Sequence, residues 1–318
     1  MSTATSSLNV VVTAMRLQAQ DIVSFELRAT GGEDLPPFTA GAHVDVQLGP
    51  QLSRSYSLLN APSERHRYVL AVQLDLQGRG GSRAMHELRL GQRLAISAPR
   101  NHFALMEDAP HTVLIAGGIG ITPLWSMAQR LQALGRSWEL YYSARTPAHA
   151  ALQENIAALA PRNVHMHYNQ TANGNHLDLA GIVGSQPSGT HFYCCGPGGM
   201  LDSFAAAAVD LPPEAVHTER FSNPLDLTQA GGFRIDLARR GQTLCVSPGS
   251  TILATLLDAG IDIPHSCLEG ICGSCEVKVL AGIPDHRDLV LSPEEQQKNT
   301  RLMACCSGSR SESLTLDL

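Results

Sequence analysis

The sequence predicts a multidomain protein with three parts in chain order: an antiparallel β-barrel, an α/β domain with a parallel sheet, and a small α+β domain. Short β-rich runs separated by turns fill residues 1–107, and strands alternate with helices over residues 108–221. The stretch 222–231 lacks periodicity and is rich in turn formers. We therefore expect a linker at 222–231 and a separate last domain at 232–318.

The first part, residues 1–107, is expected to contain six short strands. Their sequences are VVVTAMRL, IVSFELRA, HVDVQLG, RSYSLL, YVLAVQL and RLAISAP. Short β-rich runs punctuated by turn residues are typical of an antiparallel barrel.

Two motifs in this part have the residue types that bind a phosphate or a flat ring. They contain Arg54, Ser55, Tyr56 and Ser57 at a strand end, and Gly80, Gly81 and Ser82 at a helix start. Arginine can pair with a phosphate through two hydrogen bonds, and glycines expose backbone amides to it. A surface ion pair and a buried barrel tyrosine would give the same residues. The residues alone therefore leave the ligand open.

The second part, residues 108–221, alternates strands with helices. Its segments are TVLIAGG, ITPLWSMAQRLQALG, WELYYSA, AHAALQENIAALA, VHMHYNQ, HFYCCG and GGMLDSFAAAAVD. This alternation predicts a doubly wound parallel sheet.

Two glycine-rich turns follow strands of this sheet. The first contains Gly117, Gly118 and Gly120, and the second contains Cys195, Gly196 and Pro197. Glycines there let a dinucleotide approach the backbone closely, and the N-terminus of the following helix offers N–H groups to phosphate. A tight strand-to-helix turn without a ligand would also need glycine. Two such turns at one edge of the sheet favour a ligand crevice.

The third part, residues 232–318, is expected to be a small α+β unit. FRIDLARRGQTLCVSPGSTILATLLDAGIDIP predicts a hairpin and a helix capped by Ser250 or Thr251. A cysteine-rich loop and the closing strand SLTLDL follow.

The cysteines of this part have the spacing of a plant-type [2Fe-2S] cluster. Cys267, Cys272 and Cys275 form a Cys-x4-Cys-x2-Cys run, and Cys305 follows after 29 intervening residues. Zinc is the alternative, but zinc sites usually pair two Cys-x2-Cys knuckles. The spacing therefore favours an iron–sulfur cluster and one-electron chemistry.

The fourth ligand has two candidates in the sequence, because Cys306 follows Cys305 directly. We favour Cys305, with Cys306 packed on the other side. Gly270 and Gly273 are expected to let the loop fold closely around the cluster.

Composition excludes other classes of function. A formal net charge of −6 and an aromatic content of 5%, with no basic stripe, argue against nucleic-acid binding. No signal peptide and no apolar run near ~18 residues is present, so no membrane association is expected. Eight cysteines in 318 residues do not form a dense disulfide framework. We expect a cytoplasmic protein, with a monomer as the default, and we expect Cys194 and Cys245 to fill core space.

Taken together, these motifs resemble one family. RSYSL, GRGGS, AGGIGITP, YCCGP, the ERF ending at Phe221, CLEGICGSC and the final CC look like the phthalate dioxygenase reductase and vanillate O-demethylase reductase family. The resemblance spans almost the whole chain in the same order. It implies an FMN-binding barrel, an NAD-binding α/β domain and a C-terminal β-grasp ferredoxin domain, working with a separate Rieske-type oxygenase.

The resemblance also implies roles for individual residues. Those expected to bind FMN are Arg54, Ser55, Tyr56, Ser57, Val72, Gly80, Gly81, Ser82, Thr122 and Phe221. Those expected to bind NADH are Gly117, Gly118, Gly120, Cys195, Gly196 and Pro197, and the cluster ligands are Cys267, Cys272, Cys275 and Cys305. FMN is favoured over FAD because the GRGGS helix start is the phosphate site of the FMN-using members. Arg145-Thr146 lies where some relatives carry an acidic residue, which leaves NADPH as an alternative to NADH.

The implied reaction passes a hydride from NADH to the flavin and then single electrons through the cluster to an oxygenase. The cofactors carry this chemistry, so we expect no catalytic acid or base. Two alternatives stay open: a reductase for a diiron hydroxylase, and a redox-sensing flavin and iron–sulfur protein. In relatives that serve diiron hydroxylases the ferredoxin domain commonly comes first, which counts against the former.

Overall fold

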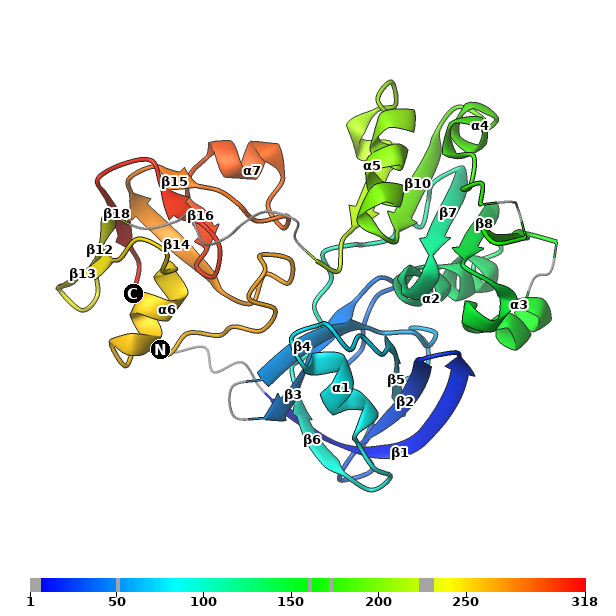
Figure 1. Ribbon diagram of the computed structural model, residues 1–318, viewed down its shortest axis with the longest axis horizontal. Coiled ribbons are helices and arrows are strands. Elements are labelled where there is room, and N and C mark those ends of the chain that lie inside the picture. The colour runs from blue at the N-terminus through cyan, green and yellow to red at the C-terminus, as the bar shows by residue number, and fades with distance from the viewer. Residues whose placement is uncertain (1–6, 50–51, 160–161, 172–173, 223–231) are drawn as a thin grey trace. The chain divides into compact units, whose positions relative to one another are not determined.

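The computed structural model describes residues 7–49, 52–159, 162–171, 174–222 and 232–318. The chain forms two compact units, Met1–Glu219 and Arg220–Leu318 (Figure 1). Within the described ranges, no helix has the length and apolar character needed to cross a membrane. Most of the expected linker, residues 223–231, lies outside the described residues.

The first part of the larger unit is the predicted antiparallel barrel. Its elements are β1 (Leu8–Ala19), β2 (Ile22–Ala29), β3 (His43–Gly49), β4 (Leu52–Ser57), β5 (Tyr68–Gln73), α1 (Gly81–His86) and β6 (Arg93–Ile96). The six strands pair in the order β4-β3-β6-β1-β2-β5, and the two end strands contact each other. Alternate residues of β1 and β2, such as Val10, Val12, Phe25 and Leu27, are buried in one core. The alternating pattern therefore gives the barrel its interior.

The second part is the predicted parallel sheet with helices on both faces. Its strands are β7 (His111–Gly117), β8 (Trp138–Ala144), β9 (Val164–Tyr168), β10 (Thr190–Cys195) and β11 (Val216–Glu219). Its α-helices are α2 (Ile121–Ala133), α3 (Gln153–Leu159), α4 (Leu179–Gly184) and α5 (Gly198–Ala207), and its 3-10 turns are η1 (Gly118–Gly120), η2 (Pro147–His149) and η3 (Pro213–Ala215). The strand order is β11-β10-β7-β8-β9. The order reverses between β7 and β10, which is where such sheets bind ligands.

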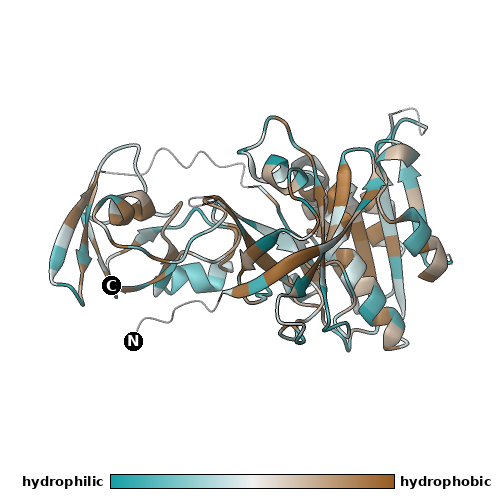
Figure 2. Ribbon diagram, turned by 90° about the horizontal axis from the view of Figure 1, so that it is seen from below, coloured by the Kyte–Doolittle hydropathy of each residue, from teal (hydrophilic) through white to brown (hydrophobic). Residues whose placement is uncertain are grey.

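Alternate residues of β7 face two different cores, as expected for a strand covered on both sides. Val113 and Ile115 pack with α4 and α5, whereas Leu114 and Ala116 pack with α2. Figure 2 shows strongly hydrophobic strands inside the larger unit. The sheet is therefore the central layer of this part.

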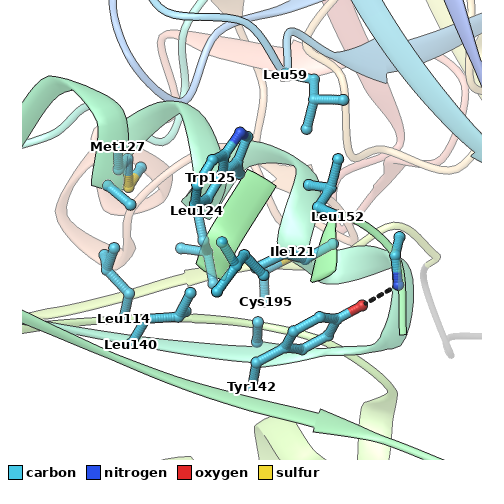
Figure 3. Packing of buried hydrophobic residues seen from close by; sticks show 14 of the residues in the cluster. Leu59, Leu114, Ile121, Leu124, Trp125, Met127, Leu140, Tyr142, Leu152 and Cys195 are labelled. Carbon is cyan, nitrogen blue, oxygen red and sulfur yellow. Dashed lines mark hydrogen bonds between the residues drawn. The ribbon is translucent and has the colours of Figure 1, made fainter. Parts of the chain in front are cut away.

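The barrel and the sheet share the core on the α2 side. Leu59 of the barrel lies in the same cluster as Trp125 and Ile121 of α2 (Figure 3). The buried Ser126 hydroxyl donates to the Asn60 carbonyl at 3.0 Å, and the Gln129 amide donates to the Leu59 carbonyl at 2.9 Å. These contacts fix the barrel against the middle of α2.

The smaller unit is the predicted α+β domain. Its elements are β12 (Phe233–Leu237), β13 (Gln242–Val246), α6 (Ile252–Asp258), β14 (Glu276–Ala281), β15 (Pro284–Asp285), α7 (Pro293–Gln297), β16 (Arg301–Met303), β17 (Gly308–Ser309) and β18 (Ser313–Leu316). Five strands pair in the order β13-β12-β18-β14-β16, with β12 and β18 parallel. Thr251 caps α6, since its hydroxyl accepts from the Ala254 N–H at 3.0 Å. The helix then buries Ile252, Leu253 and Leu256.

One expectation about the core was wrong. Cys194 is buried in β10, but Cys245 is exposed. Cys245 lies on β13, an end strand of its sheet, next to the inward-facing Val246. Because side chains of a strand alternate between faces, Cys245 points to solvent.

Candidate cofactor-binding and iron–sulfur sites

The turns that end β7 and β10 touch each other at the point where the strand order reverses. A Cβ atom on Gly120 would lie 2.1 Å from the Cys195 carbonyl oxygen, and one on Gly117 would lie 2.6 Å from Pro197 Cδ. A Cβ on Gly196 would lie 3.1 Å from Gly117 Cα. No side chain fits at these positions, so glycine is required for the two turns to meet.

Gly118 has a different reason to be glycine. Its φ of 54° lies in the left-handed region, and nothing lies within 4 Å of the place that a Cβ would occupy. The turn therefore presents open backbone to a ligand at this position. The structure brings the six expected NADH residues to one edge of the sheet.

Glu219 is a half-buried acid at the same edge, and its motif was noted in the sequence without a role for this residue. It pairs in register with Cys195 across β10 and β11. Its Oε2 atom is buried without a hydrogen-bond partner among the described residues. Burial raises the pKa of Glu219 to about 8. Burial and the charge of Glu219 both raise the pKa of the Cys195 thiol.

The sequence carried one signal that could have pointed to Glu219. The strand VHTE is only four residues long, too short to show a period. However, Glu219 is the first residue of the ERF motif that ends at Phe221. An acid at the end of a strand of the parallel sheet would have been a reason to include it.

Thr122 lies at the start of α2, beside the glycine turn. It is 3% exposed, and its hydroxyl donates to the Ile119 carbonyl at 3.0 Å. The barrel strand β5 contacts this turn. Thr122 therefore lies where the barrel meets the sheet edge formed by the two glycine turns. Its hydroxyl holds the first of these turns.

Arg54 and Tyr56 lie on one face of β4, as their spacing of two requires. Arg54 packs so closely on the start of α1 that a Cβ on Gly81 would lie 2.5 Å from Arg54 Cγ. The guanidinium donates to the Arg79 carbonyl at 2.9 Å. Burial raises the pKa of Tyr56, so its phenol stays neutral. A cation, an aromatic ring and a glycine-rich helix start are thus brought together.

Ser55 and Ser57 lie on the opposite face of β4. The Ser55 hydroxyl donates to Asp45 at 2.6 Å, and Arg100 pairs with the same carboxylate at 2.5 Å. Burial opposes ionisation of Asp45, but the charge of Arg100 and the Ser55 hydrogen bond outweigh it and lower the pKa of Asp45. The structure therefore does not place the Ser55 side chain beside Arg54 and Tyr56.

The remaining expected flavin residues of the barrel are partly engaged by the protein itself. The Ser82 hydroxyl donates to the Asp75 carbonyl at 3.2 Å and accepts from the Asp75 N–H at 3.0 Å. Val72 is 3% exposed in the barrel core. Gly80 has a φ of 81° with open space at its Cβ position. The backbone of this segment is therefore more accessible than its side chains.

Phe221 is described, but it belongs to the smaller unit. Its exposed fraction is 42%. Its expected contact with the flavin stays a prediction.

The cysteines of the smaller unit are brought together by the loop and the end of β16. Cys267 contacts the side chains of Cys272 and Cys305, and these hydrogen bonds lower the pKa of Cys267 to about 2. Cys305 contacts Cys267 and Cys275, and these contacts raise its pKa. Cys275 Sγ also accepts from the Cys305 N–H at 3.4 Å. The contacts among the four thiols therefore connect the cysteines of the tight loop with the distant Cys305.

Cys306 lies behind the loop. Its thiol contacts the Met303 carbonyl at 3.7 Å and is buried. A Cβ on Gly270 would lie 2.5 Å from Cys306 Sγ, and Gly270 has a φ of 67°. Cys305, in contrast, contacts two cysteines of the loop. This arrangement supports Cys305 as the fourth ligand.

A two-iron cluster needs only two protein thiolates on each iron. The loop glycines Gly270 and Gly273 have φ values of 67° and 72°, which gives the backbone its tight turns. The donor set and the loop geometry therefore fit a [2Fe-2S] cluster.

Comparison with known protein families supports the description of the cysteine site and of the sheet that carries the glycine turns. Residues 235–309 match the model described as a 2Fe-2S iron-sulfur cluster binding domain. Residues 96–214 match the model of the N-terminal domain of dimethylamine monooxygenase subunit DmmA-like proteins. The first match contains all four expected ligands, and the second contains both glycine turns.

Several known proteins are similar to this chain over nearly the whole length of both chains. Phenoxybenzoate dioxygenase subunit beta of Ectopseudomonas oleovorans is 50% identical over 306 residues, covering 96% of this chain and 95% of that protein. Tetrachlorobenzoquinone reductase of Sphingobium chlorophenolicum is 50% identical over 324 residues and covers 100% of both. Vanillate O-demethylase oxidoreductase of Pseudomonas sp. (strain HR199 / DSM 7063) is 41% identical over 317 residues, covering 98% of this chain and 100% of that protein.

Two solved structures complete the comparison. An intact type IV self-sufficient cytochrome P450 monooxygenase has a TM-score of 0.89 and 38% identity, and 98% of this chain matches 41% of that chain. This chain thus spans about two fifths of that protein. Phthalate dioxygenase reductase, described as a modular structure for electron transfer from pyridine nucleotides to [2Fe-2S], has a TM-score of 0.75 and 36% identity, with 98% of both chains covered. The chain therefore belongs to the phthalate dioxygenase reductase and vanillate O-demethylase reductase family, an oxidoreductase family with a C-terminal [2Fe-2S] domain.

Proposed function

We propose that this protein is the NADH-dependent reductase component of a two-component Rieske-type non-haem iron oxygenase or O-demethylase that acts on an aromatic substrate. It takes a hydride from NADH onto FMN and passes single electrons through a [2Fe-2S] cluster to the oxygenase. One observation carries this proposal. A single chain joins a barrel and a glycine-lined sheet edge in one unit with four contacting cysteines in the other.

We propose that Arg54, Tyr56 and Gly81 of the barrel form the central part of the FMN site. Arg54 would bind the phosphate through its guanidinium, and the backbone of Gly80–Ser82 would donate N–H groups to it. Tyr56, held neutral by burial, would lie against the ring. Bound FMN supplies the step between a two-electron donor and a one-electron acceptor. Ser55, Ser57, Val72, Thr122 and Phe221 complete the proposed set.

The sheet edge is proposed to hold NADH. Gly117, Gly118 and Gly120 leave room for the dinucleotide backbone, and Cys195, Gly196 and Pro197 line the nicotinamide side. We add Glu219 to this set, since its buried acid lies at the same edge. Below pH 8 it is mostly protonated, so it can donate a hydrogen bond to a carboxamide oxygen.

The smaller unit is proposed to deliver electrons to the oxygenase. Cys267, Cys272, Cys275 and Cys305 would ligate the cluster as thiolates. We propose the division 1–107 for FMN, 108–221 for NADH, 222–231 as linker and 232–318 for the cluster. We also propose a monomer in the cytoplasm, where thiolate ligands stay reduced.

An anaerobic titration tests this proposal. The visible spectrum of the purified protein is recorded before and after one equivalent of NADH, with NADPH in a parallel sample. Flavin and iron–sulfur bands that both bleach with NADH are expected. A colourless zinc protein would refute electron transfer, and bands that only NADPH bleaches would refute the choice of NADH. Subsequent reduction of a purified Rieske oxygenase, but not of a diiron hydroxylase, checks the partner.

A second function is favoured by one specific observation. The relative from Sphingobium chlorophenolicum that matches over its whole length is named a tetrachlorobenzoquinone reductase. A quinone can accept electrons from the flavin directly. The substitution Cys305→Ser separates the two functions: it should abolish oxygenase reduction, but quinone reduction at the flavin would persist.

A further inference from the structure

The back of the cluster loop packs on one short segment of the smaller unit, residues 286–291. The Leu289 N–H donates to the Gly270 carbonyl at 2.9 Å. A Cβ on Gly270 would lie 3.1 Å from Asp288 Cα. The loop between Cys267 and Cys272 therefore has Asp288 directly behind it.

The Asp288 side chain holds this segment in place through its hydrogen bonds. It is fully buried, with 0% of the side chain exposed. Its Oδ2 atom accepts from the Leu291 N–H at 2.8 Å and from the Val290 N–H at 3.3 Å. The carboxylate thus fixes the turn that carries Leu289, which in turn holds Gly270.

The other carboxylate oxygen receives no hydrogen bond from the residues that the structure describes. Asp288 Oδ1 is buried and has no hydrogen-bond partner within the described residues. His286 Nδ1 lies 3.6 Å from Asp288 Oδ1, and the His286 side chain is 8% exposed. The Arg287 guanidinium pairs with Asp285 at 2.8 Å. A buried carboxylate in such surroundings acts at longer range than one in water.

We infer that Asp288 is a positioning residue of the iron–sulfur centre, which holds the back of the cluster loop and keeps the reduction potential of the cluster low. The inference rests on the proposed function, since it requires a cluster at Cys267, Cys272, Cys275 and Cys305. Reduction adds one electron, and thus one negative charge, to the cluster. A fixed negative charge close by disfavours that step, and groups outside the ligand set are known to tune such centres.

The substitution Asp288→Asn tests the charge. Asparagine has the same shape and keeps one carbonyl oxygen to accept from Leu291, but it is neutral. We expect a normal iron content and a midpoint potential shifted to more positive values. Asp288→Ala removes the acceptor as well, and we expect it to lower the iron content per chain.

Asp262→Asn is the matched control. It makes the same chemical change five residues before Cys267, on a side chain that is 88% exposed. Water and salt screen a charge at that position. We expect its potential to match that of the wild type. NADH-driven reduction of ferricyanide, which needs only the flavin, reports in every variant whether the larger unit is intact.

The outcomes separate the inference from the proposed function. A wild type that binds no iron refutes the proposed function before any variant is made. A raised potential in Asp288→Asn, or loss of iron with ferricyanide reduction intact, supports the inference. The inference is overturned if both Asp288 variants keep full iron content and the midpoint potential of the cluster equals that of Asp262→Asn. A midpoint potential shifted to more negative values also overturns it.

Discussion

Glu219 and Cys195 are register partners at the carboxyl ends of β11 and β10, where a buried carboxyl group lies beside a buried thiol. Glu219 Oε2 has no partner within the described residues, and a Cβ on Gly120 would lie 2.1 Å from the Cys195 carbonyl oxygen. The edge that is proposed for NADH therefore contains an acid that is neutral at pH 7.

The acid gives the larger unit a defined pH dependence. Burial raises the pKa of Glu219 from 4.5 to about 8, so the folded state binds more protons than the unfolded state between these values. Stability should therefore fall as the pH rises from about 5 to 9. Glu219→Gln should remove this slope, as measured by thermal unfolding across that range. The exposed Glu154→Gln is the control, and an unchanged slope in Glu219→Gln would contradict the prediction.

The close approach of the two turns predicts a severe effect of one methyl group. In Gly120→Ala the added Cβ would overlap the Cys195 carbonyl, so the turns must separate. We expect NADH-driven flavin reduction to fall at least ~100-fold, in line with what a shift of about 1 Å costs in an active site. Stopped-flow absorbance measures it. Gly199→Ala, with nothing within 4 Å of its Cβ, should keep the wild-type rate.

Arg54 is expected to decide how tightly the flavin is held. Arg54→Lys keeps the charge but loses the planar donor pair, and lysine cannot bind a phosphate with two parallel hydrogen bonds. Loss of one charge-assisted bond, about 1.5–3 kcal/mol, weakens binding by roughly 10- to 100-fold. Flavin fluorescence in the filtrate after dilution measures this release. Arg28→Lys, at an exposed arginine paired with Glu26, should retain flavin, and equal release from both variants would sink the assignment.

The adjacent cysteines should behave differently. Cys305 contacts Cys267 and Cys275, whereas Cys306 contacts the Met303 carbonyl. Cys305→Ser should lose most of the iron and the signal of the reduced cluster in electron paramagnetic resonance. Cys306→Ser should keep both. The reverse result would make Cys306 the fourth ligand.

The sequence predicted most of the architecture because its patterns are local. Alternation in IVSFELRA and its neighbours marks strands with one buried face, and TVLIAGG marks a strand buried on both faces. The barrel, the parallel sheet and the α+β unit are all confirmed. The cysteine spacing was sufficient for the cluster because a tight loop needs a fixed number of residues between its ligands.

Other features depend on contacts that the period of a single segment does not show. The strand β11 is too short for a period, and the Glu219 Oε2 atom is buried where β11 pairs with β10. Cysteine is a residue type that is common in protein cores, but Cys245 is exposed because it lies on an end strand of the sheet. Ser55 belongs to a recognisable motif, yet its face of β4 turns it to Asp45.

The sequence by itself determined the order of the three parts, the glycine turns and the ligand spacing, since each depends on residues close together in the chain. Only the tertiary structure decided which turns meet and which acids are buried. Gly120 meets Cys195, and Asp288 lies behind Gly270, through contacts between segments far apart in sequence. Burial and charge at these places depend on strand pairing and packing, which no local pattern contains.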